Sequence, residues 1–535
     1  GRFPGAAKVA GYTRRVFRRL LSAASRVPRI AWCAVLLVVL VVVGSLAVQR
    51  PHVDFGDDYA LYLRQARSLL DGDIDRVISD NAFLVNAKGE ATSEFTPTAY
   101  PWVTSLLMAP AVRAFGPTAW DNLKLAEVAV LAAWAVVFLV FARRRVGLLA
   151  ATLVAATVAL SPWYLRYTNS ILSELPYMLV ATALLVGFDR VGRLHDPLRL
   201  PWNAAWMIGA LGTLAFNTRR EGLAVVPALL AWQAVAAWRQ RPERARITAV
   251  AARPYIALVG AGALFHLLLP ATIFPRYGGS GIGTSIRHLA GPYRREFARL
   301  LGIGVAPTVL VAVILVLAVV GVVSRWREGH DVPHAVFVAA STVLAAGHRA
   351  VNTRYLMLAV PFVLLFAVHG WRWIVDRLPP LRGTKWHRWV VVAPLALLAV
   401  HSLYASADAA RDARAFRNDG LTLLGPGTAE EDAGFEAVMR YTRGDDVVAF
   451  FKGRLMSHIT DRRALQTIDP EVILRDADWY LQRHDMFASP DGSFSPFLGV
   501  PQFTPDQAAE LGLVEVWRND RWVLWRIPHQ EPTAP

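Results

Sequence analysis

The sequence predicts a multi-pass α-helical membrane protein that ends in a C-terminal α/β domain outside the membrane. The chain has 535 residues, of which 54% are hydrophobic and 18% charged, and this composition is too apolar for a water-soluble protein of this size. It contains about eleven apolar runs suited to transmembrane helices. From about residue 405 the long apolar runs stop, and charged residues are interspersed among short β-type stretches.

The predicted domains follow from where the apolar runs lie. Residues 1–29 form a basic N-terminal segment, residues 30–404 the transmembrane domain, and residues 405–535 the α/β domain. The first run is not followed by a small-residue cleavage site, so we expect it to be retained as a helix. The predicted membrane helices are residues 30–48, 123–142, 147–163, 175–187, 204–217, 222–238, 255–274, 305–323, 334–347, 355–375 and 389–404.

Arginine-rich segments follow every second apolar run. This alternation is typical of a protein in the plasma membrane whose N-terminus is cytoplasmic, and an odd number of helices then puts the C-terminal domain on the extracytoplasmic side. The net charge of +16 reflects these arginines, so it does not indicate nucleic-acid binding. The single cysteine, Cys33, excludes an intrachain disulfide and a cysteine-based metal site.

A group of carboxylates follows the first apolar run, in the first extracytoplasmic loop at residues 50–121. The segment HVDFGDDYALYLRQARSLLDG places Asp54, Asp57 and Asp58 at the membrane surface, directly before an amphipathic helix pattern. Acids at a lipid–water boundary suggest chemistry on a lipid-borne substrate. The alternative is that Asp57 and Asp58 only cap this helix, since aspartate favours helix N-termini.

The rest of this loop contains a second apolar stretch. Residues 96–116 are interrupted by Pro97, Pro101 and Pro110, a pattern that predicts a re-entrant or interfacial helix beside the acids. The polar residues 72–94 between the two predict a mobile loop.

In the C-terminal domain we expect strands at residues 447–451, 513–517 and 522–527, with helices at residues 434–441 and 505–511. His458 lies near Asp461 in sequence, and we interpret it as an ordinary surface residue.

Other charged residues lie at the extracytoplasmic ends of the predicted helices. Glu174 begins one of them, either as a functional acid or as a carboxylate stabilised by the helix dipole. Arg219, Arg220 and Glu221 occupy a short turn between two helices. Arginines on this side run against the positive-inside tendency, so they indicate an anionic partner, with an internal Arg–Glu pair as the alternative.

Arg354 and Tyr355 repeat this theme at the start of a later helix. Arg294 and Arg295 either add to it or reach lipid headgroups. Guanidinium groups suit the binding of a lipid-linked phosphate, and carboxylates suit removal of a proton from an attacking hydroxyl.

The order of these features resembles that of the GT-C membrane glycosyltransferases, in the branch of the protein O-mannosyltransferases and the aminoarabinose transferase of lipid A. The similar motifs are DDYALYLRQARSLLDG, TPTAYPWVTSLLMAPAVRAFG, SELPYML, RREGLAV and RYLMLAVPF, which lie within residues 30–376. The resemblance implies an inverting transfer of a sugar from a polyprenyl-phosphate donor to a hydroxyl of a cell-envelope glycan, glycolipid or protein.

The resemblance also implies roles for particular residues. Asp58 would be the catalytic base with Asp57 as its neighbour, and Glu174 would be a second acid. The donor phosphate would be bound by Arg219, Arg220 and Arg354. We expect the substrate pocket to include Asp54, Tyr59, Tyr62, Tyr100, Tyr167, Glu221 and Tyr355. No nucleotide sugar is expected, because no Gly-rich nucleotide loop is present, and a divalent cation beside Asp57 and Asp58 is left open.

Two other functions fit a membrane protein with charged helix ends. A transporter or flippase would show internal repeats and charges near the centres of its membrane helices, whereas here the charges gather at helix ends on one side. A non-catalytic envelope subunit would bind sugar lipids without transferring the sugar.

Overall fold

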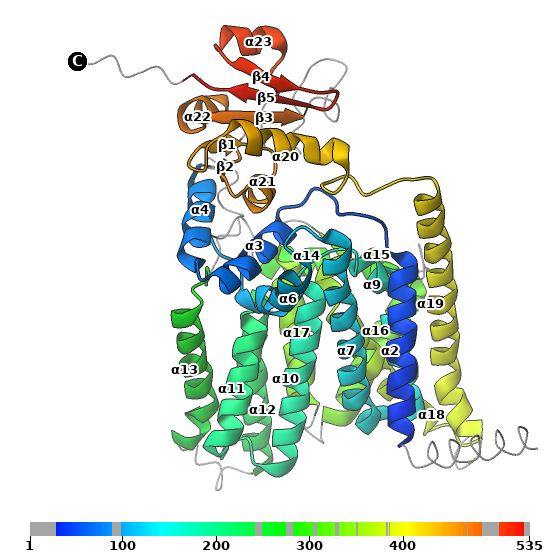
Figure 1. The fold of residues 1–535 in the computed structure, drawn as a ribbon. Helices are drawn as coiled ribbons and strands as arrows, with labels where there is room; N and C mark the ends of the chain where they lie inside the picture. Colours follow the sequence, from blue (N-terminus) through cyan, green and yellow to red (C-terminus); the bar gives the residue numbers. More distant parts are fainter. Residues whose placement is uncertain are drawn as a thin grey trace, which may run out of the picture.

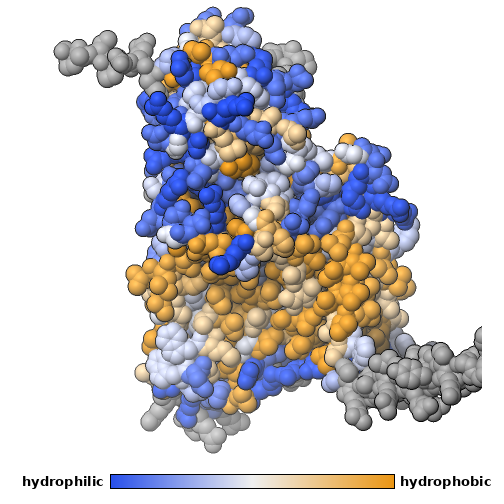
Figure 2. Space-filling view, in the orientation of Figure 1, coloured by the Kyte–Doolittle hydropathy of each residue, from blue (hydrophilic) through white to orange (hydrophobic). Residues whose placement is uncertain are grey.

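A bundle of long helices carries a small α/β domain at one end (Figure 1). The computed structural model describes residues 28–87, 98–240, 249–273, 282–302, 308–326, 331–348, 351–380, 384, 386–467, 469–483 and 502–528. On the face in view, a hydrophobic band crosses the bundle, and the α/β domain above it is largely hydrophilic (Figure 2). Among the described residues, six helices are long and apolar enough to cross a membrane, so the chain is a membrane protein.

The predicted apolar runs coincide with the helices of the bundle. The six helices that meet the length and hydropathy criteria are Arg29–Val48, Trp120–Val146, Glu174–Leu194, Arg220–Gln240, Ala249–Leu268 and Trp386–Asn418. The other runs fall on shorter helices, so the number of membrane crossings stays a prediction. The bundle consists of α2 (Arg29–Val48), α7 (Trp120–Val146), α8 (Leu148–Ala159), α10 (Glu174–Leu194), α11 (Trp202–Phe216), α12 (Val225–Gln240), α13 (Arg253–Leu268), α16 (Thr308–Arg325), α17 (Val332–Ala346), α18 (Ala359–Val375) and α19 (Trp386–Asn418).

Short helices cover the end of the bundle that faces the α/β domain. They are α3 (Asp58–Asp71), α4 (Ile74–Ala87), α6 (Trp102–Phe115), α9 (Pro162–Tyr167), η1 (Arg220–Ala224), α14 (Ile282–Ala290), α15 (Tyr293–Leu300) and η4 (Thr353–Leu356), while η2 (Ala249–Ala252) precedes α13. The predicted interfacial helix is α6, which packs against α3.

The prediction of a mobile loop at residues 72–94 is wrong for its first part, because α4 begins at Ile74 and ends at Ala87. Val77, Asp80, Asn81 and Leu84 are buried at helical spacing, and this periodicity is visible in the sequence. Residues 88–94 lie outside the described residues.

The C-terminal domain is built on a five-stranded mixed sheet in the order β2-β1-β3-β5-β4. Its strands are β1 (Val447–Ala449), β2 (Arg463–Leu465), β3 (Trp479–Arg483), β4 (Val514–Arg518) and β5 (Trp522–Arg526), and its helices are α20 (Ala429–Tyr441), α21 (Gly453–Thr460), α22 (Pro470–Asp476) and α23 (Pro505–Glu510). β1 pairs in parallel with β2 and β3, whereas β5 is antiparallel to β3 and β4.

The predicted domain boundary at residue 405 falls inside α19, which continues to Asn418. The composition changes there because the residues become polar, but alanine and arginine are strong helix formers and the helix continues. The chain then runs back along the first loop, where the Phe55 amide donates to the Leu424 carbonyl at 2.8 Å and the Leu423 amide to the Pro51 carbonyl at 3.1 Å. This pairing fastens the start of the C-terminal domain to the segment that leads into Asp58.

A buried charge cluster ties the bundle helices together at the end away from the C-terminal domain. Arg145 on α7 donates to both carboxylate oxygens of Asp189 on α10 at 2.5 Å and to Asp331 at 2.9 Å. Arg325 on α16 donates to the other oxygen of Asp331 at 2.6 Å. Every charge in this cluster has an opposite partner, as burial requires.

Helices α16 and α18 cross at two glycines. A Cβ atom at Gly321 would overlap the carbonyl oxygen of Phe366, and one at Gly370 would overlap that of Leu317. Small residues at such a crossing allow the two backbones to touch, which is the packing that stabilises helices in a membrane.

Replacing Gly321 by leucine is therefore expected to destabilise the bundle by about 1–3 kcal/mol, because the new side chain forces α16 and α18 apart. The thermal unfolding midpoint in detergent measures this change. Val319→Leu is the matched control, since Val319 lies on the same helix and is 63% exposed. Equal midpoints for the two variants would contradict this account of the crossing.

Candidate active site

Asp58, the first residue of α3, lies where the bundle meets the C-terminal domain. The Tyr100 hydroxyl donates to its Oδ1 at 2.6 Å, and Arg354 Nη1 donates to its Oδ2 at 3.3 Å. The Asp58 side chain keeps 36% of its surface exposed and Arg354 keeps 24%, so both remain accessible. A carboxylate and a guanidinium from distant parts of the chain therefore meet at one accessible point.

Further charges extend this pair into a chain of alternating sign. Glu174, only 4% exposed at the start of α10, lies 3.4 Å from Arg354 Nε and accepts from Arg219 Nη1 at 2.5 Å. Arg219 donates in turn to Glu221 at 2.9 Å. Asp58, Arg354, Glu174, Arg219 and Glu221 thus form one connected group, which we call the charged chain.

The surroundings of Asp58 favour its ionised form. Burial raises the pKa of Asp58, but the charge of Arg354, the hydrogen bond from Tyr100 and the charge of Arg454 together outweigh burial and hold the pKa below its ordinary value of 3.8. Asp58 is consequently a carboxylate at neutral pH and free of a proton. Its two oxygens accept from Tyr100 and Arg354, and the described residues show no side-chain hydrogen bond that caps α3, which argues against the interpretation that Asp58 only caps this helix.

A small cavity of about 20 Å³ lies behind the charged chain. It is lined by charged and aromatic residues and by residues of α17 and the start of α18: Glu174, Tyr177, Arg219, Glu221, Ser341, Thr342, Ala345, Arg354, Tyr355, Met357 and Leu358. The guanidinium carbons of Arg354 and Arg219 lie 5.3 Å and 5.6 Å from the centre of the Tyr355 ring. Stacking on this ring fixes the two guanidinium planes relative to each other.

Asp57 lies on the other side of Asp58, toward the C-terminal domain. Its Oδ2 is 3.7 Å from Lys452 Nζ, and its Oδ1 is buried without a hydrogen-bond partner in the described part of the chain. The described residues contain no group of three or more His, Cys, Asp or Glu side chains that could hold a metal ion. Asp57 and Asp58 would need further ligands to hold a divalent cation, which stays a prediction.

Not every predicted residue joins this group. Arg220 turns away from Arg219 and donates to the carbonyls of Thr272 at 3.0 Å and Phe216 at 3.2 Å. Tyr59 is buried edge-on against Trp120, with ring centres 5.7 Å apart. Asp54 is exposed in the loop before α3, on the side of Lys124 and Arg50.

Two other predicted tyrosines lie close to the charged chain. The Tyr62 ring packs on the Tyr100 ring, with centres 5.0 Å apart. The Tyr167 hydroxyl donates to Asn352 Oδ1 at 3.4 Å, and Asn352 caps the short helix that carries Arg354.

Three basic residues, two near Asp57 and Tyr100 and one beneath the loop that leads to Asp58, were not predicted. Arg454 and Lys452 come from the C-terminal domain and approach Tyr100 and Asp57. Lys124 on α7 is wholly buried and donates to the carbonyls of Arg50, at 2.8 Å, and His52. Lys124 could have been predicted, because a lysine within an apolar run is unusual. Nothing in the local sequence distinguishes Arg454 or Lys452 from surface residues.

His458 is also not at the surface, contrary to its interpretation from the sequence. It is 2% exposed, and its Nε2 lies 3.0 Å from the Pro117 carbonyl oxygen. It belongs to the contact between the C-terminal domain and the first loop.

No protein-family model matches the chain, and no curated protein sequence matches it. Among solved structures, ArnT from Cupriavidus metallidurans bound to undecaprenyl phosphate is 14% identical, with a TM-score of 0.54 over 93% of this chain and 98% of that protein. ArnT in the apo state gives 14% identity and a TM-score of 0.53 over the same shares. The resemblance to the GT-C membrane glycosyltransferases is confirmed at the level of the fold.

Proposed function

We propose that this chain, which has the fold of the GT-C membrane glycosyltransferases, transfers a sugar from a polyprenyl-phosphate donor to a hydroxyl acceptor with inversion at the anomeric carbon. The observation that carries this proposal is the direct contact of Asp58 with Arg354, which joins a carboxylate suited to an acceptor to guanidinium groups suited to a phosphate. We place the reaction on the extracytoplasmic face of the plasma membrane, on the side of the C-terminal domain.

In the proposed reaction Asp58 accepts the proton of the acceptor hydroxyl while the hydroxyl oxygen attacks the anomeric carbon. The bond between that carbon and the phosphate oxygen breaks, and the electron pair leaves with the polyprenyl phosphate. Arg354 and Arg219 donate hydrogen bonds to the departing phosphate and offset its growing charge. Proton, sugar and leaving group are then all accounted for by residues of one site.

Donor binding would also prepare Asp58 for its role. In the free protein Arg354 helps to hold the pKa of Asp58 low, and a low pKa makes a carboxylate a weak base. A phosphate bound to Arg354 would compete for the guanidinium and bring its own negative charge. Both effects raise the pKa of Asp58, so the base becomes stronger only when the donor is present.

Glu174 is proposed to act through the arginines. It lies between Arg219 and Arg354 and contacts both, so it sets their separation, and its charge keeps the two cations together in the absence of the donor. Its second carboxylate oxygen is buried without a hydrogen-bond partner in the part of the chain described here.

The structural neighbour supports the class of donor, since ArnT was solved with undecaprenyl phosphate bound. The acceptor is proposed to be a cell-envelope glycan, glycolipid or protein that contacts the C-terminal domain. A transporter or flippase is a weaker proposal, because the charged chain lies at one end of the bundle and not along its length.

The proposal is tested with the purified protein reconstituted in liposomes. We expect release of undecaprenyl phosphate from at least one of two synthetic donors, undecaprenyl-phosphate mannose and undecaprenyl-phosphate arabinose, when a membrane glycolipid extract supplies acceptors. Mass spectrometry should find the sugar on an acceptor hydroxyl with inverted configuration. Movement of intact donor across the bilayer without release would support a flippase, and binding alone would support a non-catalytic subunit. Repeating the assay with EDTA tests the divalent cation.

A further inference from the structure

We infer that Arg454 of the C-terminal domain is a positioning residue for the proposed base Asp58 and acts on it through Tyr100. This inference rests on the proposed function. It means that the C-terminal domain completes the active site in addition to contacting an acceptor.

Arg454 is buried between the C-terminal domain and the first loop. It is 4% exposed, its Nη1 donates to the Tyr100 hydroxyl oxygen at 2.6 Å, and its Nε donates to Asn81 Oδ1 at 3.0 Å. Its guanidinium carbon lies 4.6 Å from the centre of the Tyr100 ring. Arg454 therefore fixes both the hydroxyl and the ring of Tyr100.

The direction of the hydrogen bonds follows from the chemistry of the two groups. A guanidinium can only donate, and a tyrosine hydroxyl has a single proton. Because the Tyr100 oxygen accepts from Arg454, its own proton is directed to the acceptor 2.6 Å away, Asp58 Oδ1. A hydrogen bond that is fixed at both ends in this way holds the carboxylate in one rotamer and is strengthened by the cation behind it.

The helix that carries Arg454 is itself held against the first loop. A Cβ atom at Gly453 would overlap the end of the Leu84 side chain, so the start of α21 packs closely on α4. Nearby, His458 contacts the Pro117 carbonyl. Lys452, two residues before Arg454, reaches toward Asp57. The start of α21 thus brings one cation toward Asp57 directly and a second toward Asp58 through Tyr100.

Loss of Arg454 would free Asp58 to move toward Arg354. The titratable or charged groups around Asp58 are Asp57 and Tyr62 on its own segment, Tyr100, Arg354, His348, and Arg454. Among the described residues, the guanidinium in direct contact with Asp58 is that of Arg354, the proposed phosphate ligand, and without Arg454 its attraction for Asp58 is less opposed. The base would then be misplaced and would compete with the donor phosphate.

The test compares the wild-type protein with Arg454→Gln, Arg454→Lys and Tyr100→Phe. Arg454→Gln should lower kcat on the order of 10- to 100-fold, as misplacement of a reacting group does, with the donor KM changed much less. The acidic limb of its kcat–pH profile should move to higher pH, because one of the charges that lowers the pKa of Asp58 is gone. Arg454→Lys keeps the charge and should restore part of the activity.

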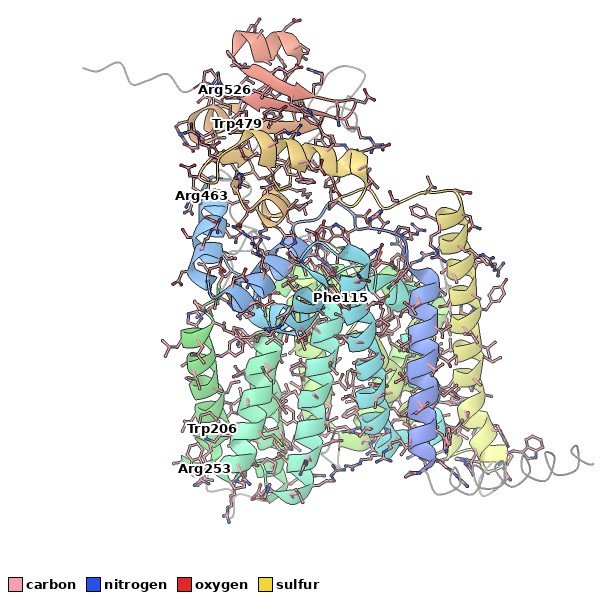
Figure 3. All side chains as sticks on the ribbon, viewed as in Figure 1. Phe115, Trp206, Arg253, Arg463, Trp479 and Arg526 are labelled. Carbon is pink, nitrogen blue, oxygen red and sulfur yellow. The ribbon has the colours of Figure 1, made fainter. Side chains whose placement is uncertain are left out.

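Two controls make the test decisive. Arg463, labelled in Figure 3, also joins the C-terminal domain to α4, through Asp80 at 3.3 Å, but does not contact Tyr100, so Arg463→Gln should leave kcat and its pH profile unchanged. The double variant Arg454→Gln/Tyr100→Phe should be no less active than Tyr100→Phe, since both changes break the same connection.

Unchanged kcat and pH profile in Arg454→Gln, with Asp58→Asn inactive, would overturn the inference and leave the proposed function intact. An active Asp58→Asn protein would overturn the proposed function instead.

Discussion

Replacing Asp58 by asparagine is expected to lower the rate of sugar transfer by about 10²- to 10⁴-fold, the range that a positioned general base contributes. Asparagine keeps the size of the side chain, but it has a single acceptor oxygen, so it can accept from Tyr100 or from Arg354 and not from both as the two carboxylate oxygens do. Its amide also cannot take a proton from the acceptor hydroxyl. The single-turnover rate of undecaprenyl phosphate release measures the effect. Equilibrium binding of undecaprenyl phosphate should be retained, since the proposed phosphate ligands stay in place.

Asp57→Asn and Asp71→Asn complete this comparison. Asp71 lies at the other end of α3 and pairs with Arg67 at 3.2 Å, so its replacement should leave transfer unchanged. Asp57 is 3.7 Å from Lys452 and, among the described residues, makes no ion pair with an arginine of the charged chain, so we expect a smaller loss than for Asp58. Transfer by Asp58→Asn at the wild-type rate, or an equal loss in Asp57→Asn and Asp58→Asn, would contradict the assignment of the base.

The elements of the bundle were largely predictable because the membrane imposes a simple rule on the sequence. An apolar run of sufficient length forms a helix, and each predicted run coincides with one. The ends of the helices, and the helices outside the membrane, were less predictable. Helix α19 continues well past its apolar part, and α4 has the helical spacing of buried residues within a stretch that is polar overall. The polarity of a segment indicates whether water or lipid surrounds it, but it does not indicate whether its backbone is helical.

The residues of the candidate site could be predicted only where a charged residue lies next to an apolar segment, a position at which charged side chains are unusual. Asp58, Glu174, Arg219 and Arg354 are charged residues at apolar helix ends, and the structure brings them together. Arg220 showed the same signal as Arg219, but these two consecutive residues direct their side chains to different partners. Arg454 comes from an ordinary polar stretch of the C-terminal domain. It reaches the site because this domain packs against α4, where Arg454 contacts Asn81, and against Tyr100, which precedes α6. Such contacts depend on tertiary structure, which a single sequence does not display.

Replacing Arg354 by glutamine is expected to lower kcat/KM for the lipid donor by about 10²- to 10³-fold, as loss of one donor to a developing negative charge does. Arg354 is the member of the charged chain that contacts both Asp58 and Glu174. Its loss therefore removes a proposed phosphate ligand and also removes the cation that contacts the proposed base. Arg354→Lys should recover part of the activity, because lysine keeps the charge but not the planar fork that binds two phosphate oxygens.

The same substitution has a second, independent consequence for pH dependence. In the free wild-type protein the pKa of Asp58 lies below its ordinary value, and kcat/KM reports the free enzyme, so the acidic limb of the kcat/KM–pH profile should lie at acidic pH. Without Arg354 the effect of burial is less opposed, the pKa of Asp58 rises, and the rate should fall as the pH drops through that higher value. Arg220→Gln is the matched control, because Arg220 contacts Thr272 and Phe216 and should affect neither the donor kinetics nor the pH profile. If Arg220→Gln lost as much activity as Arg354→Gln, the phosphate would have to lie on the Arg220 side of the turn, away from Asp58, and in-line attack by an acceptor activated at Asp58 would no longer be geometrically available.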